Sequence, residues 1–491
     1  MKCLPYLLFG LVFSCTTSKQ TTESRPPNII IMYTDDQGYG DVGVFGAKGF
    51  QTPNLDQLAN EGMRFTDFYV SQPVCTSSRA SLLTGCYANR IGLTGAFSHR
   101  TKKGIHKEET TIAEVCKSKG YATAIFGKWH LGLQPQFLPP NHGFDEYYGI
   151  PYSNDMWPYH PDREEGFYAT LPLIEGLEIV NPNVQPEDQT QFTQSFTERA
   201  VSFINRKKDE PFFLYLAHPQ PHVPLFASDK FKGQTKRGLF GDVISEIDWS
   251  MGQILQALRD QGIEEKTLII FASDNGPWIA YGEHGGSSGP LREGKGTTYE
   301  GGIRVPCIMR WPGKIPAASN CKEPVMTIDI LPTIAGLIGA ELPKRKIDGL
   351  DIWPLMAGES GAKSPHEALY FYYKRNELQA LRAGKWKLVF PHEVRMNVDP
   401  QPDTVRYRSG YVTTEPGTNG YPFVLEYPMC GLELYDLEAD IGEQHDLAKS
   451  HPEIVERLQT LAEKARADLG DKLTNREGIN QRQAAFVVSA E

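Results

Sequence analysis

The stretch Pro27-Asn28-Ile29-Ile30-Ile31-Met32-Tyr33-Thr34-Asp35-Asp36 begins as an apolar run and ends at two adjacent carboxylates. A short apolar run bounded in this way is typical of a buried strand. Three further runs end at polar side chains: 122–126 before Lys128 and His130, 211–217 before His218 and His222, and 267–273 before Asp274 and Asn275. Ligands of open α/β sheets bind beyond the carboxyl ends of the strands, so we expect these four groups to converge.

Helical patterns lie between these runs. Apolar residues from Val243 to Leu258 recur at three- and four-residue intervals, which predicts a helix ended by Gly262. Residues 111–119 predict another helix, which ends at Gly120. Because strands alternate with helices, the predicted fold class is α/β, with a mixed, mostly parallel sheet flanked by helices on both faces.

The alternation of predicted strands and helices stops near residue 365. Residues 368–373 and 386–390 look like strands with no crossover helix between them, and residues 452–468 predict a closing helix. The segment 392–430 is long for a loop, which favours a functional insertion. The predicted segments are a main α/β domain (27–364), a smaller C-terminal α+β domain with an antiparallel sheet (365–475) and a tail (476–491).

Composition and charge narrow the class of protein. A chain of 491 residues with 40% hydrophobic and 22% charged residues can bury a large core, which excludes disorder, collagen and coiled coil. The 50 Lys and Arg against 60 Asp and Glu leave a net charge of -10, so nucleic acid is not an expected partner. An anionic substrate would need a local cluster of cations.

The first residues indicate export. Residues 1–15 hold one Lys and an apolar run too short to cross a bilayer, which is typical of a secretory signal peptide. Val12-Phe13-Ser14-Cys15 resembles a bacterial lipobox, in which the Cys is lipidated, and residues 16–26 would then be a tether. We therefore expect a periplasmic or cell-surface lipoprotein, or a secreted protein, with membrane contact only through a lipid anchor at Cys15.

The segment Cys75-Thr76-Ser77-Ser78-Arg79-Ala80-Ser81-Leu82-Leu83-Thr84-Gly85 carries the most information about chemistry. Its residues predict a helix that begins near Cys75, and the free N-H groups of a helix N-terminus favour an anion. Arg79, one turn later, shares the face of Cys75. Taken alone, the pattern favours a buried Cys near a helix cap beside a solvated Arg, so the interpretation depends on the rest of the chain.

This segment resembles the modification signature of type I sulfatases, C-x-P-x-R or C-x-A-x-R followed by T-G, whose Cys is oxidised to formylglycine. The resemblance covers roughly residues 27–450, is closest to the arylsulfatase A type and implies an alkaline-phosphatase-like core. Other blocks that resemble the family, in the family's order, are Tyr33 to Asp41, Thr52 to Asp56, Gly127 to Gly132, His142 to Asp145, Ser273 to Gly276 and Gly294 to Gly302.

The resemblance implies a divalent cation held by Asp35, Asp36, Asp274 and Asn275, with the modified side chain of Cys75 as a further ligand. Hard oxygen ligands suit Ca²⁺ or Mg²⁺ better than zinc, and the family favours Ca²⁺ over Mg²⁺. Asp35-Asp36 alone is more often a turn or a helix cap. An Asp-Asn pair after a second strand makes the metal site the better interpretation.

The resemblance also implies how a sulfate monoester would be cleaved. Hydrated formylglycine at position 75 would attack sulfur with one of two hydroxyls, while Arg79 holds them and balances their charge. Lys128 and Lys295 would bind the sulfuryl oxygens as point cations. A single Lys is usually a solvated surface charge, so these two assignments rest on the family blocks that contain them.

Two histidines would transfer the protons. His222, together with Lys295, would protonate the departing oxygen, and His130 would take the proton from the second hydroxyl when sulfate is released. His218 follows the same strand, and the choice of His222 rests on the resemblance of His222-Val223-Pro224 to the family's H-x-P element. Ser153 is a further predicted sulfate-binding residue.

Ser77 departs from the commonest signature, which has Pro or Ala at that position. The departure leaves open which partner converts Cys75: an oxygen-dependent formylglycine-generating enzyme, which prefers Pro there, or an anaerobic sulfatase-maturing enzyme.

The expected substrate is a sulfated saccharide, because aromatic faces stack on sugars and an anion pocket would bind the sulfate. Trp157, Trp278 and Arg292 are predicted to contact it, and the insertion with Arg395 and Arg406 could wall the pocket. Two alternatives stay open: a phosphonate or phosphodiester hydrolase of the same superfamily, and a non-catalytic surface lipoprotein that binds sulfated glycan.

Overall fold

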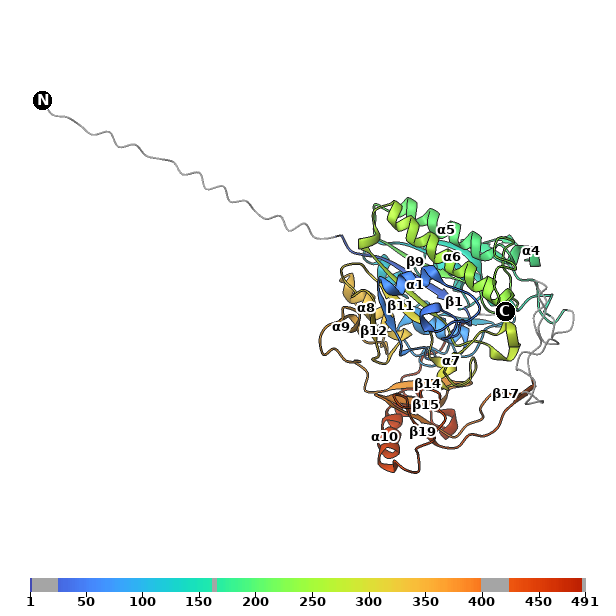
Figure 1. Ribbon diagram of the computed structural model, residues 1–491, viewed down its shortest axis with the longest axis vertical. Coiled ribbons are helices and arrows are strands. Elements are labelled where there is room, and N and C mark those ends of the chain that lie inside the picture. The colour runs from blue at the N-terminus through green and yellow to red at the C-terminus, as the bar shows by residue number, and fades with distance from the viewer. Residues whose placement is uncertain (2–24, 161–165, 399–423, 488–491) are drawn as a thin grey trace.

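The computed structural model describes residues 1, 25–160, 166–398 and 424–487 (Figure 1). The lipobox with Cys15, nearly all of the predicted signal peptide and Arg406 of the predicted insertion lie outside these residues. In the described part of the chain, a ten-stranded sheet runs through the centre of the main body. Its strands, in spatial order, are β12 (Ser319–Cys321), β2 (Met63–Phe65), β11 (Cys307–Arg310), β10 (Thr267–Ser273), β1 (Asn28–Thr34), β9 (Phe212–Ala217), β5 (Ala122–Lys128), β6 (Glu146–Ile150), β7 (Leu173–Glu175) and β8 (Glu178–Asn181).

The five central strands, β10, β1, β9, β5 and β6, are parallel, and antiparallel strands flank them. Every residue of β1, β9, β5 and β10 is buried, which matches their nearly continuous apolar sequences. A strand covered on both faces needs apolar side chains on both, so it loses the alternation of a half-exposed strand. The mixed, mostly parallel sheet predicted from the sequence is confirmed.

Helices cover both faces of this sheet. The predicted stripe from Val243 to Leu258 is buried within α6, which packs beside α5 over one face (Figure 1). The helices of the described residues are α1 (Pro53–Asn60), α4 (Pro186–Gln189), α5 (Phe192–Lys207) and α6 (Leu239–Asp260) on that side, and α2 (Cys75–Thr84), α3 (Ile112–Lys117), α7 (Glu300–Ile303), α8 (Ile330–Leu337), α9 (Trp353–Met356) and α10 (Pro452–Leu469) in the other layer and the C-terminal part.

The C-terminal part contains a four-stranded antiparallel sheet beside the predicted closing helix, α10 (Figure 1). Its hydrophobic side chains are continuous with the core beneath α2 and α3. The sheet consists of β14 (Leu369–Tyr373), β15 (Glu377–Ala383), β16 (Trp386–Val389) and β19 (Glu433–Asp436). Three two-stranded pairs complete the described strands: β3 (Phe68–Tyr69) with β13 (Val325–Met326), β17 (Met396–Val398) with β18 (Val424–Glu426), and β4 (Lys103–Gly104) with β20 (Ala485–Phe486).

Across the described segments, none of the helices combines the length and the apolar character needed to cross a membrane.

Candidate active site

Strand register brings the polar groups at the ends of the central strands together. Thr34 of β1 pairs with Ser273 of β10, so Asp35 and Asp274 leave neighbouring strands side by side. On the other flank, β5 approaches β9 so closely that a side chain on Gly127 would overlap the carbonyl oxygen of Ala217. Gly127 also has a φ of 117°, which favours glycine. This close approach delivers the next residue, Lys128, to the same edge of the sheet.

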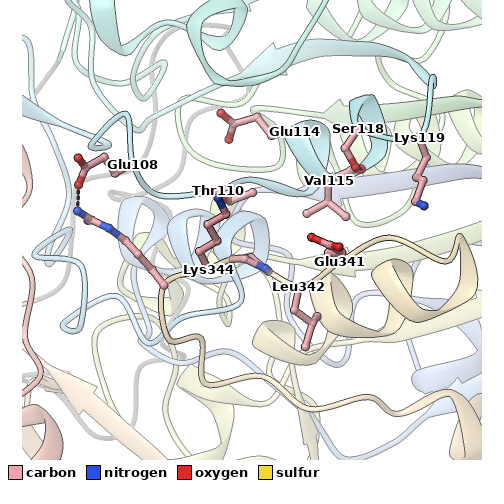
Figure 2. Close-up of a pocket in the computed structure, with 11 residues that line it drawn as sticks. Glu108, Thr110, Glu114, Val115, Ser118, Lys119, Glu341, Leu342 and Lys344 are labelled. Atoms are coloured by element: carbon pink, nitrogen blue, oxygen red, sulfur yellow. Dashed lines mark hydrogen bonds and ion pairs between the residues drawn. The ribbon is translucent and has the colours of Figure 1, made fainter.

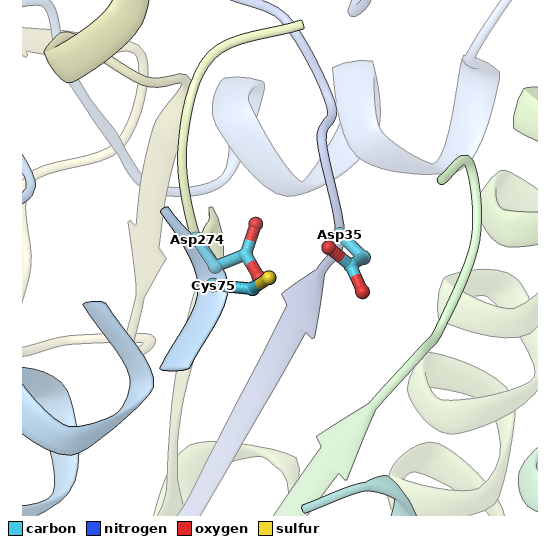
Figure 3. Close-up of side chains that lie close together, drawn as sticks. All are labelled: Asp35, Cys75 and Asp274. Atoms are coloured by element: carbon cyan, nitrogen blue, oxygen red, sulfur yellow. The ribbon is translucent and has the colours of Figure 1, made fainter. Parts of the chain in front are cut away.

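Cys75 is the first residue of α2, and its side chain points at the strand ends (Figure 3). Ligand atoms of Asp35, Cys75 and Asp274 all lie within 4.8 Å of one another. All ten residues of α2 are buried, so the helix is part of the core and its N-terminus is fixed in place. Burial raises the pKa of the Cys75 thiol to about 11, so the unmodified side chain is a neutral thiol at physiological pH.

Three buried cations face the three buried carboxylates. Arg79 lies 2.9 Å from Asp274 and 3.5 Å from Asp35, and Lys128 forms an ion pair with Asp35. Lys295 lies 2.8 Å from Asp36. The side chains are almost completely removed from solvent, so these charges interact more strongly than surface pairs do.

Two of the carboxylates respond differently to this burial. Burial acts to raise the pKa of Asp35, but the positive charge of Lys128, with the neighbouring cations, holds that pKa well below its usual value. Burial also raises the pKa of Asp274, and the negative charge of Asp35 adds to the effect. The two carboxylates are therefore too close to be ionised independently.

Two oxygens in this cluster lack a hydrogen-bond partner although they are buried: Oδ1 of Asp35 and Oδ1 of Asn275. The amide of Asn275 donates to Asp36 Oδ1 at 2.7 Å, which leaves its own oxygen open. Buried oxygens without a donor are costly unless a ligand supplies one. Carboxylate and amide oxygens suit a hard divalent cation, so Asp35, Asp36, Asp274 and Asn275 fit such an ion.

His130 has the geometry of a proton acceptor. Its Nε2 lies 2.7 Å from the carbonyl oxygen of Phe97, which can only accept, so Nε2 carries the proton and Nδ1 keeps the lone pair. Nδ1 is buried and has no hydrogen-bond partner. Burial, with the charge of Lys128, lowers the pKa of His130 well below its usual value, which keeps the ring neutral.

His222 faces the cluster from the loop after β9. Its Nδ1 donates to the carbonyl oxygen of Val223 at 2.5 Å, and its Nε2 lies 3.5 Å from Asp36 Oδ2. The Nε2 atom therefore faces the catalytic cluster beside the Asp36 carboxylate. The ring of Trp278 contacts the imidazole edge to face, with centroids 5.3 Å apart.

A cavity of about 390 Å³ opens above Cys75. Ser153, His222, Lys295 and Trp278 line it, and Ser153 Oγ accepts a hydrogen bond of 3.2 Å from Lys128. The remaining lining residues are Val74, Thr94, Gly95, Ala96, Asp155, Met156, Tyr373, Lys374, Arg375 and Arg395.

Two predicted substrate-contacting side chains lie away from this cavity. Trp157 is fully buried and packs edge to face against Phe226, in the core beside α6. The Arg292 guanidinium lies over the Tyr299 ring, 3.7 Å from its centroid, and donates to Tyr435 Oη at 3.0 Å. Both side chains are used in packing between segments, which their residue types could not reveal.

The turn between β14 and β15 lines the cavity although the sequence did not indicate it. It contributes Tyr373, Lys374 and Arg375, about 300 residues after Cys75 in the chain. Lys374 and Asn376 have φ values of 49° and 79°, which mark a tight reversal. In the sequence, only the pair of basic residues, Lys374 and Arg375, could have indicated that this turn contacts an anionic substrate.

A larger hollow of about 750 Å³ lies elsewhere, between α3 and residues 341–345 (Figure 2). Figure 2 shows several carboxylates around it, including Glu108, Glu114 and Glu341, and none of the predicted site residues lines it. Its three carboxylates are matched by three cations, Lys119, Lys344 and Arg345, so the lining offers no excess of positive charge to an anionic ligand.

Comparison with known proteins decides the family. The sulfatase family profile matches residues 27–340, which is more than half of the chain. The chain belongs to the sulfatase family. Two C-terminal profiles match as well, described as "N-sulphoglucosamine sulphohydrolase, C-terminal" over residues 293–392 and "C-terminal region of aryl-sulfatase" over residues 364–487.

Among similar curated proteins, this sulfatase is 39% identical to human arylsulfatase A over 89% of its own chain and 87% of the relative. It is also 39% identical to N-acetylgalactosamine-6-sulfatase of Sus scrofa, over 77% and 74% of the two chains. The predicted membership of the type I sulfatases is therefore confirmed, and the protein is an enzyme that hydrolyses sulfuric esters.

Solved structures agree on the fold. The crystal structure of Ps i-CgsB in complex with k-i-k-neocarrahexaose has a TM-score of 0.71 and 31% identity, covering 90% of this chain and 92% of that one. The PsFucS1 sulfatase from Pseudoalteromonas sp. has a TM-score of 0.76 and 28% identity, covering 90% and 91%.

Proposed function

We propose that this sulfatase hydrolyses sulfate monoesters of a carbohydrate, using residue 75 as formylglycine together with a divalent cation. The observation that carries the proposal is the position of the Cys75 side chain. It lies within 4.8 Å of Asp35 and Asp274 ligand atoms, at the floor of a cavity lined by Lys295 and His222. The names of similar proteins, N-acetylgalactosamine-6-sulfatase among them, support a saccharide as the substrate.

Two groups complete the chemistry. Formylglycine formed from Cys75 would supply, when hydrated, a hydroxyl nucleophile toward sulfur. A divalent cation held by Asp35, Asp36, Asp274 and Asn275, which we propose to be Ca²⁺, supplies Lewis acidity that favours deprotonation of a nearby hydroxyl. The open oxygens of Asp35 and Asn275 support this ligand set.

The chain's own cations would then bind and orient the sulfate. Lys128 and Lys295 each already pair with one carboxylate, so each ammonium is held in place with donors to spare. Ser153, bonded to Lys128, would add a hydroxyl donor. Arg79 would balance the charge of the residue-75 side chain. These groups are fixed before substrate arrives, so little reorganisation is needed as charge develops.

The two histidines suit opposite proton transfers. His222 lines the cavity, where its Nε2 could donate a proton to the departing sugar oxygen. His130 is buried and neutral with Nδ1 open, so it could accept a proton as sulfate is released. The different environments of the two histidines therefore suit His222 to act as the acid and His130 as the base within one site.

The same proposal includes export and maturation. The signal-peptide pattern of residues 1–15 supports a secreted, periplasmic or cell-surface protein, with lipidation at Cys15 in the last case. Cys75 would need a formylglycine-generating or anaerobic sulfatase-maturing enzyme as a partner. The Ser at position 77 keeps both partners open.

The test is sulfate release from defined sulfated mono- and oligosaccharides, using protein whose conversion at residue 75 has been verified by intact mass. Cys75→Ala should abolish release, while Cys430→Ala, which changes the half-buried thiol, should retain it. Chelation should stop release and added Ca²⁺ should restore it. Undiminished release by Cys75→Ala would reject the mechanism.

Rates on an aryl phosphodiester, measured in parallel, separate the proposal from a phosphodiester hydrolase. A phosphonate monoester hydrolase from Silicibacter pomeroyi shares the fold, with a TM-score of 0.61 at 18% identity. Faster phosphodiester than sulfate ester hydrolysis would assign this chain to that reaction class. An unconverted thiol at residue 75 in the native host, with tight glycan binding, would favour a binding protein.

A further inference from the structure

The wall of the catalytic cavity that belongs to the C-terminal part is strongly basic. Lys374 and Arg375 come from the turn between β14 and β15, and Arg395 comes from the segment after β16. Together with Lys295 they give the described lining four cations, against the single carboxylate of Asp155. The chain as a whole has a net charge of -10, so this local positive surface runs against the overall composition.

Two of these cations have no ion-pair partner among the described residues. Lys295 pairs with Asp36, and Lys374 lies 3.1 Å from Glu393. Neither Arg375 nor Arg395 forms an ion pair with any carboxylate of residues 25–160, 166–398 or 427–487. The Arg375 side chain is exposed, and that of Arg395 is half-buried. Unpaired guanidiniums at the mouth of a substrate cavity are available to a ligand.

Arg395 lies close to Lys295, which we propose to bind the reacting sulfate. Its guanidinium lies 5.5 Å from the centroid of Trp278, and the Lys295 ammonium lies 4.3 Å from the same ring. Its side chain also rests on Gly296, where an added Cβ would come within 3.1 Å of Arg395 Cδ. Arg395 is therefore held directly beside the residue that we assign to the reacting sulfate, and Arg375 continues the positive surface outward.

A second anionic group on the substrate is the ligand that this arrangement suits. Guanidinium groups bind sulfate and carboxylate oxygens through paired N-H donors. The deep cations, Lys128 and Lys295, are held by carboxylates of the catalytic cluster, whereas Arg375 and Arg395 have no such partner in the part of the chain that the structure describes. One anion of a substrate can therefore occupy the floor while another contacts the rim.

We propose that Arg375 and Arg395 form a subsite for a second anion of the saccharide, a sulfate ester or a uronic carboxylate near the cleaved sulfate. The inference rests on the proposed carbohydrate sulfatase function and narrows its substrate to multiply charged saccharides. Arg375 and Arg395 are specificity residues in this account, since neither contacts the reacting sulfur.

The experiment measures binding without turnover. Full-length Cys75→Ala protein is titrated with three saccharides: a monosulfated sugar, the same sugar with a second sulfate, and the monosulfated sugar linked to a uronic acid. At least one two-anion ligand should bind about tenfold tighter than the one-anion ligand. Arg375→Ala should lower that preference about fivefold, and Arg395→Gln should lower it by a similar factor.

Arg457→Ala is the matched control, because it removes an exposed arginine of α10 that does not line the cavity. It should leave the preference unchanged. Raising the salt concentration should weaken the preference in the parent protein, since a partly exposed charge contact is screened. The two-anion ligand that binds more tightly than the monosulfated sugar shows whether the second anion is a sulfate or a carboxylate.

The inference is overturned if both two-anion ligands bind no tighter than the one-anion ligand, or if neither arginine variant changes the preference. These outcomes are independent of the proposed function, which is judged by sulfate release from the converted protein. Sulfate release without a preference for two-anion ligands would contradict the subsite alone. A preference for two-anion ligands without sulfate release would contradict the catalytic proposal.

Discussion

Two clusters of buried charge in the described part of this sulfatase differ in how their oxygens are paired. The proposed catalytic cluster, around Asp35 and Asp274, leaves oxygens of Asp35 and Asn275 without a donor. The second cluster joins the segments around β3 and α7 to the C-terminal sheet, and each carboxylate oxygen in it lies near a cation or a donor. Glu443 Oε1 makes no hydrogen bond but lies 2.7 Å from the Lys387 ammonium. Its members are Asp67, Tyr69, Glu300, Arg304, Arg382, Lys387 and Glu443.

The difference separates a cluster that works on a ligand from one that only holds segments together. Lys387 lies 2.9 Å from Glu300 and 2.7 Å from Glu443, with all three side chains fully buried. Such a closed arrangement offers nothing to a substrate. The catalytic cluster offers open oxygens at the floor of a cavity, and the protein tolerates their cost because a ligand can complete them.

Replacing a carboxylate of the open cluster should affect activity far more than stability. In Asp274→Asn, Arg79 keeps Asp35 as a partner at 3.5 Å, so the free energy of unfolding should change by less than about 2 kcal/mol. The rate of sulfate release should fall at least about 1,000-fold, because a charged ligand of the proposed cation becomes a neutral amide. Steady-state kinetics and urea unfolding of the same preparation measure the two effects. A large loss of stability with retained activity would contradict the proposed difference between the two clusters.

Breaking the closed cluster should have the reverse effect. Lys387→Met leaves the buried Glu443 without a cation and close to Glu300, which should lower the free energy of unfolding by about 3 kcal/mol. Lys385→Met is the control in the turn just before the same strand, because Lys385 pairs with Asp436 at the surface and its loss should cost under about 1 kcal/mol. Chemical denaturation measures the free energy of unfolding of both variants. An equal decrease in the two would contradict this account.

A smaller effect concerns His218, a buried neutral neighbour of the site. It lies 3.0 Å from Ser250 Oγ, and burial lowers its pKa to about 3. Below pH 6.5 the unfolded chain binds a proton here and the folded protein does not, so stability falls as the pH falls. Between pH 7.5 and pH 5 this residue should cost about 2 kcal/mol, a contribution that His218→Asn removes.

The stability difference between wild type and His218→Asn should therefore shrink by that amount at the lower pH. His445→Asn, at a side chain 78% exposed, should show no such change. A difference that stays constant with pH would mean that His218 already titrates in the folded protein.

The sequence was sufficient to predict the convergence of Asp35, Lys128, His222 and Asp274. Each follows a mostly apolar run, and parallel strands bring their carboxyl ends to one edge of a sheet whatever lies between them in the chain. The first residue of α2 was also predictable, because its helix-forming residues begin at Cys75.

The rim of the cavity could not be predicted in the same way. Tyr373, Lys374 and Arg375 reach the cavity only because the antiparallel sheet docks beside Lys295, and that docking depends on packing between distant segments. Trp157 shows the converse case, because a tryptophan near the site suits a sugar or a core equally well, and here it fills the core. Strand β15 was missed because its sequence, Glu377–Ala383, mixes charged and apolar residues.

The complete burial of α2 constrains the order of events in the life of the molecule. Cys75 is 2% exposed, and none of the ten residues of its helix reaches the surface. An enzyme that recognises this segment must hold it in its own cleft, which a packed helix does not allow. If an enzyme oxidises Cys75, as we propose, it would therefore have to act before the chain folds, because the folded protein does not expose this segment.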